Sequence, residues 1–167
     1  AKASPVFRDA LERCAAAIDT ELGGSLLEVM FAPGEENAPL DETRYTQPAL
    51  FAIQYALVEL WRSVGITPSV VLGHSVGEFA AACCAGVMSL DDAAKLVTLR
   101  GRLMQELPDG GAMAAVFTCE SAVKDTIARI PGVVVVAGIN GPDETVVSGE
   151  TAAVQATIAA FAKEGVR

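Results

Sequence analysis

A serine between two glycines, Ser75 in the segment 73–77 (Gly-His-Ser-Val-Gly), is the residue best suited to covalent chemistry in this chain. A β-branched run at 69–72 precedes it and an Ala-rich segment follows, which predicts a sharp turn from a short buried strand into a helix. Glycines remove side chains that would clash in such a turn, and free N–H groups at the helix start favour developing negative charge. This pattern is typical of a serine nucleophile in acyl transfer. The alternative is a glycine-rich turn with an incidental serine.

A second candidate is Arg100, in a helix predicted over residues 90–107. At about 100° per residue, Arg100 falls in the middle of the apolar face of this helix, whereas Arg102 falls on the polar side. A buried guanidinium needs a partner, because losing that partner costs roughly 3–5 kcal/mol. A substrate carboxylate would bind it in a bidentate pair. The residues alone equally allow an ion pair with Glu78, or a stem that reaches out to solvent.

The only histidine, His74, directly precedes Ser75. A general base must reach the hydroxyl proton at about 3 Å. Because neighbouring side chains on a tight turn diverge, we expect His74 to pack at the turn and to be a poor base for Ser75.

Composition limits the class of protein. The chain has 167 residues, of which 51% are hydrophobic and 20% are charged, so it can bury a core and is not disordered. A net charge of −9 argues against nucleic acid and anionic membranes as partners. The four cysteines form no Cys-x-x-Cys or Cys/His cluster, which predicts no metal site and a reduced, cytoplasmic protein. Neither a signal peptide nor a membrane span is expected.

The elements that must position these residues divide into regions 1–111 and 112–167, with a hinge expected at 108–111. The first region is predicted to be mainly helical around the Ser75 turn. The second has the order β-α-β-β-α, which is most of a ferredoxin-like unit without its last strand. The helices are predicted at 5–22, 26–31, 49–61 with Pro48 near the start, 79–85, 89–106, 120–130 and 151–163, and the strands at 69–72, 113–117, 133–139 and 145–148.

Three ordered segments carry a family resemblance: 47–51 (Gln-Pro-Ala-Leu-Phe), 73–78 (Gly-His-Ser-Val-Gly-Glu) and 100–105 (Arg-Gly-Arg-Leu-Met-Gln). Together they resemble the malonyl-CoA:acyl carrier protein transacylases, and most of all the acyltransferase domains of modular polyketide synthases. Segments 140–142 (Asn-Gly-Pro) and 146–149 (Val-Val-Ser-Gly) fit the small subdomain of that family.

The resemblance implies an α/β fold with two subdomains. Residues 1–111 would belong to a large α/β-hydrolase-like subdomain that carries the serine turn. Residues 112–167 would form an inserted ferredoxin-like subdomain, and both would be incomplete in this chain. The active site of the family lies in the cleft between the two.

The resemblance also implies a ping-pong reaction in polyketide biosynthesis. Ser75 would attack the thioester of malonyl-CoA, and the phosphopantetheine thiol of an acyl carrier protein would then take the malonyl group from the acyl-serine. Arg100 would pair with the malonyl carboxylate, and the Val76 backbone N–H would form half of the oxyanion hole. Gln47 and Asn140 match cleft-lining positions, and His74 is a further candidate for substrate contact.

Extender choice and partners follow from the same resemblance. Val76, the aliphatic residue after the nucleophile, and the context of Gln47 resemble malonyl-selective domains, although one methyl group is worth only ~1–3 kcal/mol in a pocket. No bound cofactor and no metal are expected. The expected partners are the acyl carrier protein and the ketosynthase and linker regions of the same synthase, with no nucleic acid and no membrane.

Two features of the family are not found in this sequence. These are the N-terminal Gly-Gln-Gly segment, which supplies a second oxyanion donor, and the downstream catalytic histidine. The 167 residues alone are therefore expected to be inactive as a transacylase. The competing hypotheses are a serine esterase or thioesterase of the α/β-hydrolase class, and a non-catalytic fragment that docks a carrier protein.

Overall fold

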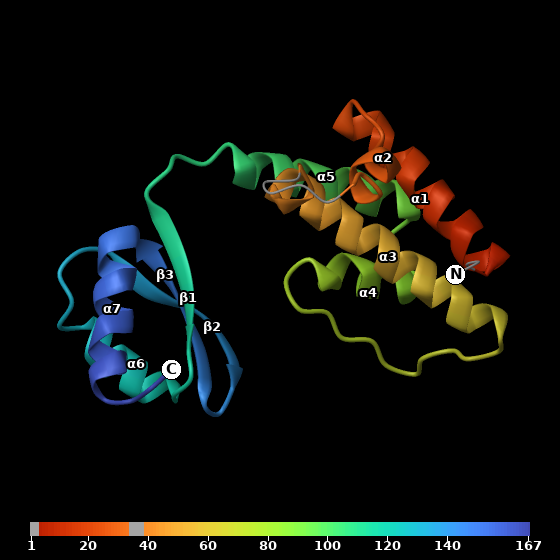
Figure 1. Cartoon of the computed structure of the whole chain (residues 1–167). Helices are drawn as coiled ribbons and strands as arrows, with labels where there is room; N and C mark the ends of the chain where they lie inside the picture. Colours follow the sequence, from red (N-terminus) through yellow and green to blue (C-terminus); the bar gives the residue numbers. More distant parts are fainter. Residues whose placement is uncertain (1–3, 34–38) are drawn as a thin grey trace. The chain divides into compact units, whose positions relative to one another are not determined.

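A computed structural model describes residues 4–33 and 39–167. The chain divides into two compact units, Ala1–Leu107 and Pro108–Arg167, and each is considered by itself (Figure 1). The subdomain boundary expected between residues 111 and 112 remains a prediction. In the described part of the chain, no helix combines the length and apolarity that crossing a membrane requires.

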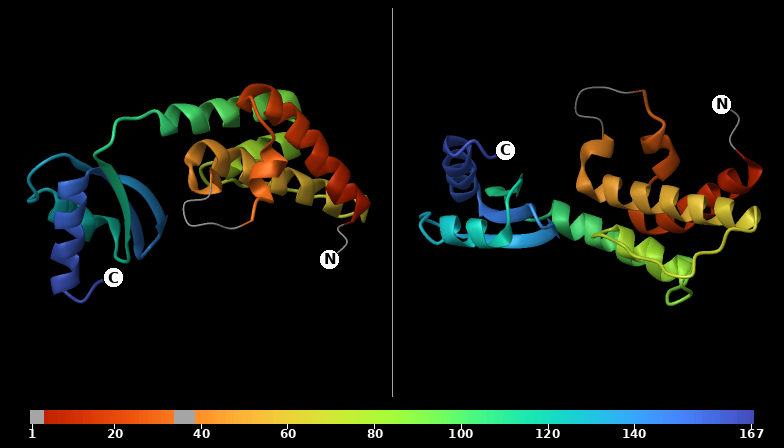
Figure 2. Two further views of the ribbon diagram at one scale, coloured as in Figure 1. Left: turned by 45° about the horizontal axis from the view of Figure 1, so that its top comes forward. Right: turned by 90° about the horizontal axis from the view of Figure 1, so that it is seen from below.

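The first unit is built from helices in the residues that the structure describes. Helices α1, α3 and α5 pack on one another (Figure 2). Small side chains such as Ala10, Ala52 and Ala93 are fully buried in the core of this unit. Small residues let helix backbones approach closely, which brings side chains of different helices within reach of each other. The elements are α1 (Pro5–Leu22), α2 (Leu26–Met30), η1 (Pro39–Asp41), α3 (Thr43–Ser63), α4 (Gly77–Cys84) and α5 (Leu90–Gln105).

Helix α3 begins earlier than predicted. The sequence suggested a start near Pro48, but the helix begins at Thr43 and contains Pro48. Its first turn is closed by the Thr46 N–H, which donates to the Glu42 carbonyl at 2.9 Å. Pro48 has no N–H group, so the backbone hydrogen bond to the Arg44 carbonyl is missing. A missing bond is tolerated better here, near the helix start, than in the centre of the helix.

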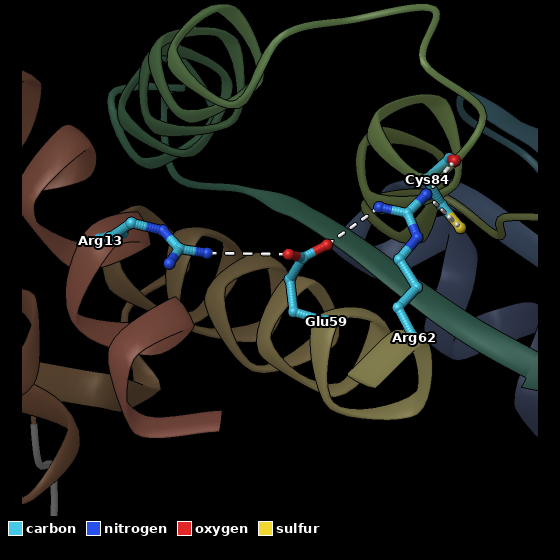
Figure 3. Close-up of polar contacts among 4 residues, drawn as sticks. All are labelled: Arg13, Glu59, Arg62 and Cys84. Carbon is cyan, nitrogen blue, oxygen red and sulfur yellow. Dashed lines mark hydrogen bonds and ion pairs between the residues drawn. The ribbon is translucent and has the colours of Figure 1, made fainter. Parts of the chain in front are cut away.

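Glu59 links three elements of this unit (Figure 3). Its carboxylate lies 3.7 Å from the Arg13 guanidinium of α1 and 2.9 Å from that of Arg62 on its own helix. Arg62 also donates to the Cys84 carbonyl, at 2.6 Å, at the end of α4. Exposed ion pairs contribute only about 0–1 kcal/mol to the stability of a folded protein. The hydrogen bond to Cys84 adds to this, because it satisfies a carbonyl that the C-terminal end of α4 leaves unpaired. It links the C-terminal end of α4 to α3.

The prediction of a strand at 69–72 is wrong. This stretch is an extended segment without a strand partner between α3 and α4, and the side chains of Val70 and Leu72 are 85% and 96% exposed (Figure 1). A β-strand exists only through hydrogen bonds to a neighbouring strand. The described residues of the first unit contain none, so the apolar β-branched sequence is extended but unpaired.

The second unit confirms the predicted β-α-β-β-α order. All three strands pair antiparallel in the order β1-β3-β2, and α6 and α7 cover one face of the sheet (Figure 1). Alternation along the strands matches this arrangement: Val134 and Val147 are buried, whereas Met113 and Val135 are exposed. The elements are β1 (Gly111–Val116), α6 (Glu120–Ile127), β2 (Val134–Gly141), β3 (Glu144–Glu150) and α7 (Thr151–Lys163).

Gly149 should be essential to this sheet. A Cβ at Gly149 would press on the Val133 carbonyl oxygen and lie 2.7 Å from the Val134 Cα, both of which are backbone atoms. We expect Gly149→Ala to lower the free energy of unfolding by about 1–3 kcal/mol, measured by urea denaturation followed by circular dichroism. Gly141→Ala is the matched control, because no atom lies within 4 Å of a Cβ there. Equal stability of the two variants would contradict the prediction.

Candidate active site

The backbone at Ser75 has the strained geometry of a nucleophile turn. Its φ is +52°, and no other non-glycine residue in the described part of the chain has a positive φ. Such a conformation costs roughly 1–3 kcal/mol and persists only where surrounding structure imposes it. Hydrogen bonds from the Gly77 N–H to the His74 carbonyl (2.9 Å) and from the Glu78 N–H to the Ser75 carbonyl (3.2 Å) close the turn. The predicted sharp entry into a helix is confirmed, since α4 begins at Gly77.

Only the first glycine of the turn is required by close packing. A Cβ at Gly73 would collide with the backbone of Glu78, so no larger residue fits without moving the turn. At Gly77 the nearest atom to a Cβ is the Gln54 amide nitrogen, at 3.8 Å, which is an ordinary contact. The tight approach of the segment before Ser75 to the start of α4 therefore depends on Gly73.

Arg100 lies against Ser75 but is only half-buried, because the buried face of α5 is centred on Ala94, Val97 and Gly101. Its Nη2 donates to the Ser75 Oγ at 3.3 Å, and its Nη1 donates to the Gln47 Oε1 in a short hydrogen bond. No acidic side chain among the described residues pairs with Arg100, so the alternative ion pair with Glu78 is not formed. Three residues from α3, the turn and α5 thus form one Ser75–Arg100–Gln47 cluster.

The surroundings of this cluster are apolar and open to solvent on one side. Gln47 is only 6% exposed, while Ser75 is exposed and Arg100 is half-buried. An apolar groove of about 420 Å³ lies beside the guanidinium. The other residues that line it are Phe79, Leu96, Leu99, Leu103, Met104 and Leu107.

Val76 lies at the N-terminal cap of α4, directly after Ser75. Its backbone N–H makes no hydrogen bond within the part of the chain that the structure describes. An unpaired N–H at a helix start carries partial positive charge, so this group can donate a hydrogen bond to an anionic oxygen that develops beside Ser75.

His74 and Asn140 are candidates for substrate contact in addition to the Ser75–Arg100–Gln47 cluster. His74 borders a separate hollow of about 570 Å³ between the extended segment and helices α3 and α4, and neither Ser75 nor Arg100 lines it. Asn140 belongs to the second unit, where its Nδ2 donates to the Glu144 Oε1 at 3.0 Å. Substrate contact by these two residues remains a prediction.

The cysteines are weaker candidates for a nucleophile. Burial raises the pKa of Cys14 to about 12, so this thiol stays protonated at neutral pH. A hydrogen bond with the Ser121 hydroxyl lowers the pKa of Cys119, which belongs to the second unit. No cluster of metal-ligating side chains occurs among the described residues.

The sequence analysis missed two residues that contact the cluster. Gln47 Nε2 donates to the Thr43 Oγ1 at 2.8 Å and to the Met104 Sδ at 3.3 Å. Thr43 precedes Gln47 by one helical turn, a spacing that would have indicated the contact if the true start of α3 had been recognised. The contact with Met104 depends on how α5 packs on α3, which has no local signal.

Comparisons with known proteins agree with one another. The profile of the family described as acyl transferase domain matches residues 1–167. The spectinabilin polyketide synthase system protein NorA' of Streptomyces orinoci is 44% identical over 165 residues, which are 98% of this chain and 4% of that protein. The crystal structure of the acyltransferase domain from the second module of the salinomycin polyketide synthase is similar with a TM-score of 0.87 and 47% identity, over 99% of this chain and 38% of that chain.

A third match is a structure of a type II polyketide synthase acyl carrier protein in complex with its malonyl transacylase. Its TM-score is 0.83 at 33% identity, over 95% of this chain and 53% of that chain. These likenesses confirm the predicted mixed α/β fold. The chain spans less than two thirds of the length of each of these three proteins.

Proposed function

The chain belongs to the acyl transferase domain family, and on this premise we propose that it loads malonyl units from malonyl-CoA onto an acyl carrier protein in polyketide biosynthesis. The observation that carries the proposal is the 3.3 Å contact between the Arg100 guanidinium and the Ser75 hydroxyl. It combines a nucleophile with a cation that no carboxylate of the described residues neutralises. A substrate that joins a thioester to an acid group matches both.

In the first half-reaction, the Ser75 Oγ forms a bond to the thioester carbonyl carbon and the bond from that carbon to the CoA sulfur breaks. The proton that leaves Oγ ends on the departing thiol. The Val76 N–H stabilises the negative oxygen that develops on the carbonyl. The second half-reaction is the reverse, with the phosphopantetheine thiol of the carrier protein as the acceptor.

Arg100 is proposed to hold the malonyl carboxylate. Two N–H groups of a guanidinium match two carboxylate oxygens, and the apolar groove beside Arg100 favours the pairing. Once Oγ is acylated, its contact with Arg100 is replaced by the carboxylate of the bound malonyl group. Val76 is an aliphatic residue next to the nucleophile, and its place in the turn supports a preference for malonyl over larger extender units.

The proposed partners follow from the relatives. The carrier protein is supported by the transacylase complex to which the chain is similar, and the ketosynthase and linker regions by the likeness to modular synthases. Asn140 and His74 are retained as proposed substrate contacts. We place the reaction in the cytoplasm, since malonyl-CoA is the proposed donor and the cysteines are free.

Mass spectrometry tests the proposal directly. Incubating the full-length protein with malonyl-CoA should add one malonyl group to the peptide that contains Ser75, and holo acyl carrier protein should then remove it.

In the same assay we expect a polypeptide of these 167 residues to transfer little malonyl, because its only histidine, His74, lines a hollow that Ser75 does not line. Hydrolysis of p-nitrophenyl esters without carrier acylation would favour an esterase, and carrier binding without an adduct would favour a docking module.

A further inference from the structure

We propose that Thr43 is a positioning residue: its hydroxyl orients the Gln47 amide, which holds Arg100 and so sets the preference for acyl groups that carry a carboxylate. This inference rests on the proposed function, because it concerns the substrate choice of the same site. Neither the resemblance nor the motifs around Ser75 assign a role to Thr43.

The hydrogen bonds of Gln47 determine which end of its amide faces Arg100. Its two N–H groups have acceptors in the Thr43 Oγ1, at 2.8 Å, and the Met104 Sδ, at 3.3 Å. Its carbonyl oxygen is therefore left to accept from the Arg100 Nη1. A flipped amide would point N–H groups at a guanidinium that has only donors. Of the two acceptors, a hydroxyl is much stronger than a thioether, so Thr43 provides the stronger anchor for the Gln47 N–H groups.

Close packing of α5 on α3 brings these groups together. A Cβ at Gly101 would lie 3.0 Å from the Thr43 carbonyl oxygen and 3.2 Å from the Arg44 Cα. The backbone of α5 therefore lies directly on the first turn of α3. Thr43 and Gln47 are one turn apart on that helix, so both side chains reach the crossing where Arg100 begins its stem.

The absence of charge on the residues that hold Arg100 matters as much as their position. Gln47 and Ser75, the partners of Arg100 among the described residues, are both uncharged. A glutamate or aspartate at either place would orient the guanidinium equally well, but would neutralise it. A neutral anchor instead keeps the whole positive charge available to a ligand, which is what discrimination between malonyl and acetyl groups requires.

Thr43→Val tests this role in the full-length protein, because it keeps the side-chain shape and removes the hydroxyl. Acylation of Ser75 by malonyl-CoA and by acetyl-CoA is measured, with kcat and KM for each. We expect kcat/KM for malonyl-CoA to fall about three- to tenfold, the usual effect of one lost hydrogen bond, mainly through KM. Acetyl-CoA should change by less than about twofold, since it has no carboxylate. Thr43→Ser should restore malonyl use.

Several results would overturn the proposal. Parallel losses with both donors would indicate a purely structural role, and an unchanged malonyl reaction would indicate no role. Failure of Thr43→Ser to rescue would show that the hydroxyl is not what matters. Gln47→Glu is a second test that does not depend on whether Thr43→Val folds. It should lower kcat/KM for malonyl-CoA far more than for acetyl-CoA. An equal effect on both donors would contradict the proposal that an uncharged partner of Arg100 is required.

The variant Arg100→Ala separates this proposal from the function on which it rests. If Arg100→Ala lowers malonyl use selectively and Thr43→Val does not, only the role of Thr43 is wrong. If Arg100→Ala affects both donors equally, Arg100 is not the carboxylate receptor, and both proposals fail together.

Discussion

Replacing Ser75 with alanine is expected to abolish the acyl-enzyme and to lower malonyl transfer by at least about 10⁴-fold, the effect of removing a serine nucleophile in other enzymes. The physical reason is that the Ser75–Arg100–Gln47 cluster contains no second nucleophile that could replace this hydroxyl. Burial also keeps the Cys14 thiol protonated. The measurement is the intact mass of the full-length protein after incubation with malonyl-CoA.

Ser69 provides a matched control for Ser75. It is an exposed serine of the same extended segment, and its hydroxyl makes no hydrogen bond in the part of the chain that the structure describes. Ser69→Ala should therefore keep the full adduct. A malonyl adduct that persists on Ser75→Ala would place the nucleophile elsewhere and would end the present assignment.

Replacing Arg100 with alanine should change which donor the protein uses. A charge-assisted pair in a partly buried site is worth about 3 kcal/mol, so kcat/KM for malonyl-CoA should fall roughly a hundredfold. Acetyl-CoA lacks the carboxylate and should lose much less, so the ratio of acetyl to malonyl transfer rises. Both rates are measured as acylation of the carrier protein under the same conditions.

Arg102 and a conservative change serve as controls for Arg100. Arg102 lies two residues along α5, is exposed and makes no ion pair among the described residues, so Arg102→Ala should leave both rates unchanged. Arg100→Lys keeps the charge without the planar fork and should restore only part of the malonyl rate. Equal losses of malonyl and acetyl transfer in Arg100→Ala are incompatible with a receptor for the carboxylate.

Much of the local structure was predictable because its causes are local. Ser89 caps α5: its hydroxyl accepts from the Asp92 N–H at 3.1 Å, and both residues are close together in the sequence. Helix α1 has the predicted bounds, since its apolar spacing and the Gly23 after it are both visible in the sequence. The order of strands and helices after residue 111 was predictable for the same reason.

One error concerns whether an element forms, and the other concerns where a helix begins. The β-branched run at 69–72 has the composition of a strand, but in the described structure no neighbour bonds to it. Pro48 has the usual signature of a helix start, but hydrogen bonds one turn earlier extend α3 to Thr43. Composition specifies which conformation a segment favours. Strand pairing and packing determine whether that strand or helix forms and where it begins.

By itself the sequence determined that a glycine turn presents Ser75 and that Arg100 projects from the apolar face of its helix, because periodicity and turn chemistry act over a few residues. It left open whether Arg100 pairs with Glu78 or reaches a ligand. Tertiary structure alone decided that Arg100 does not pair with Glu78, by setting α5 on the first turn of α3 at Gly101, so that Arg100 meets Gln47 across 53 positions of sequence. Such a contact depends on the crossing of two helices, which no short stretch of sequence encodes.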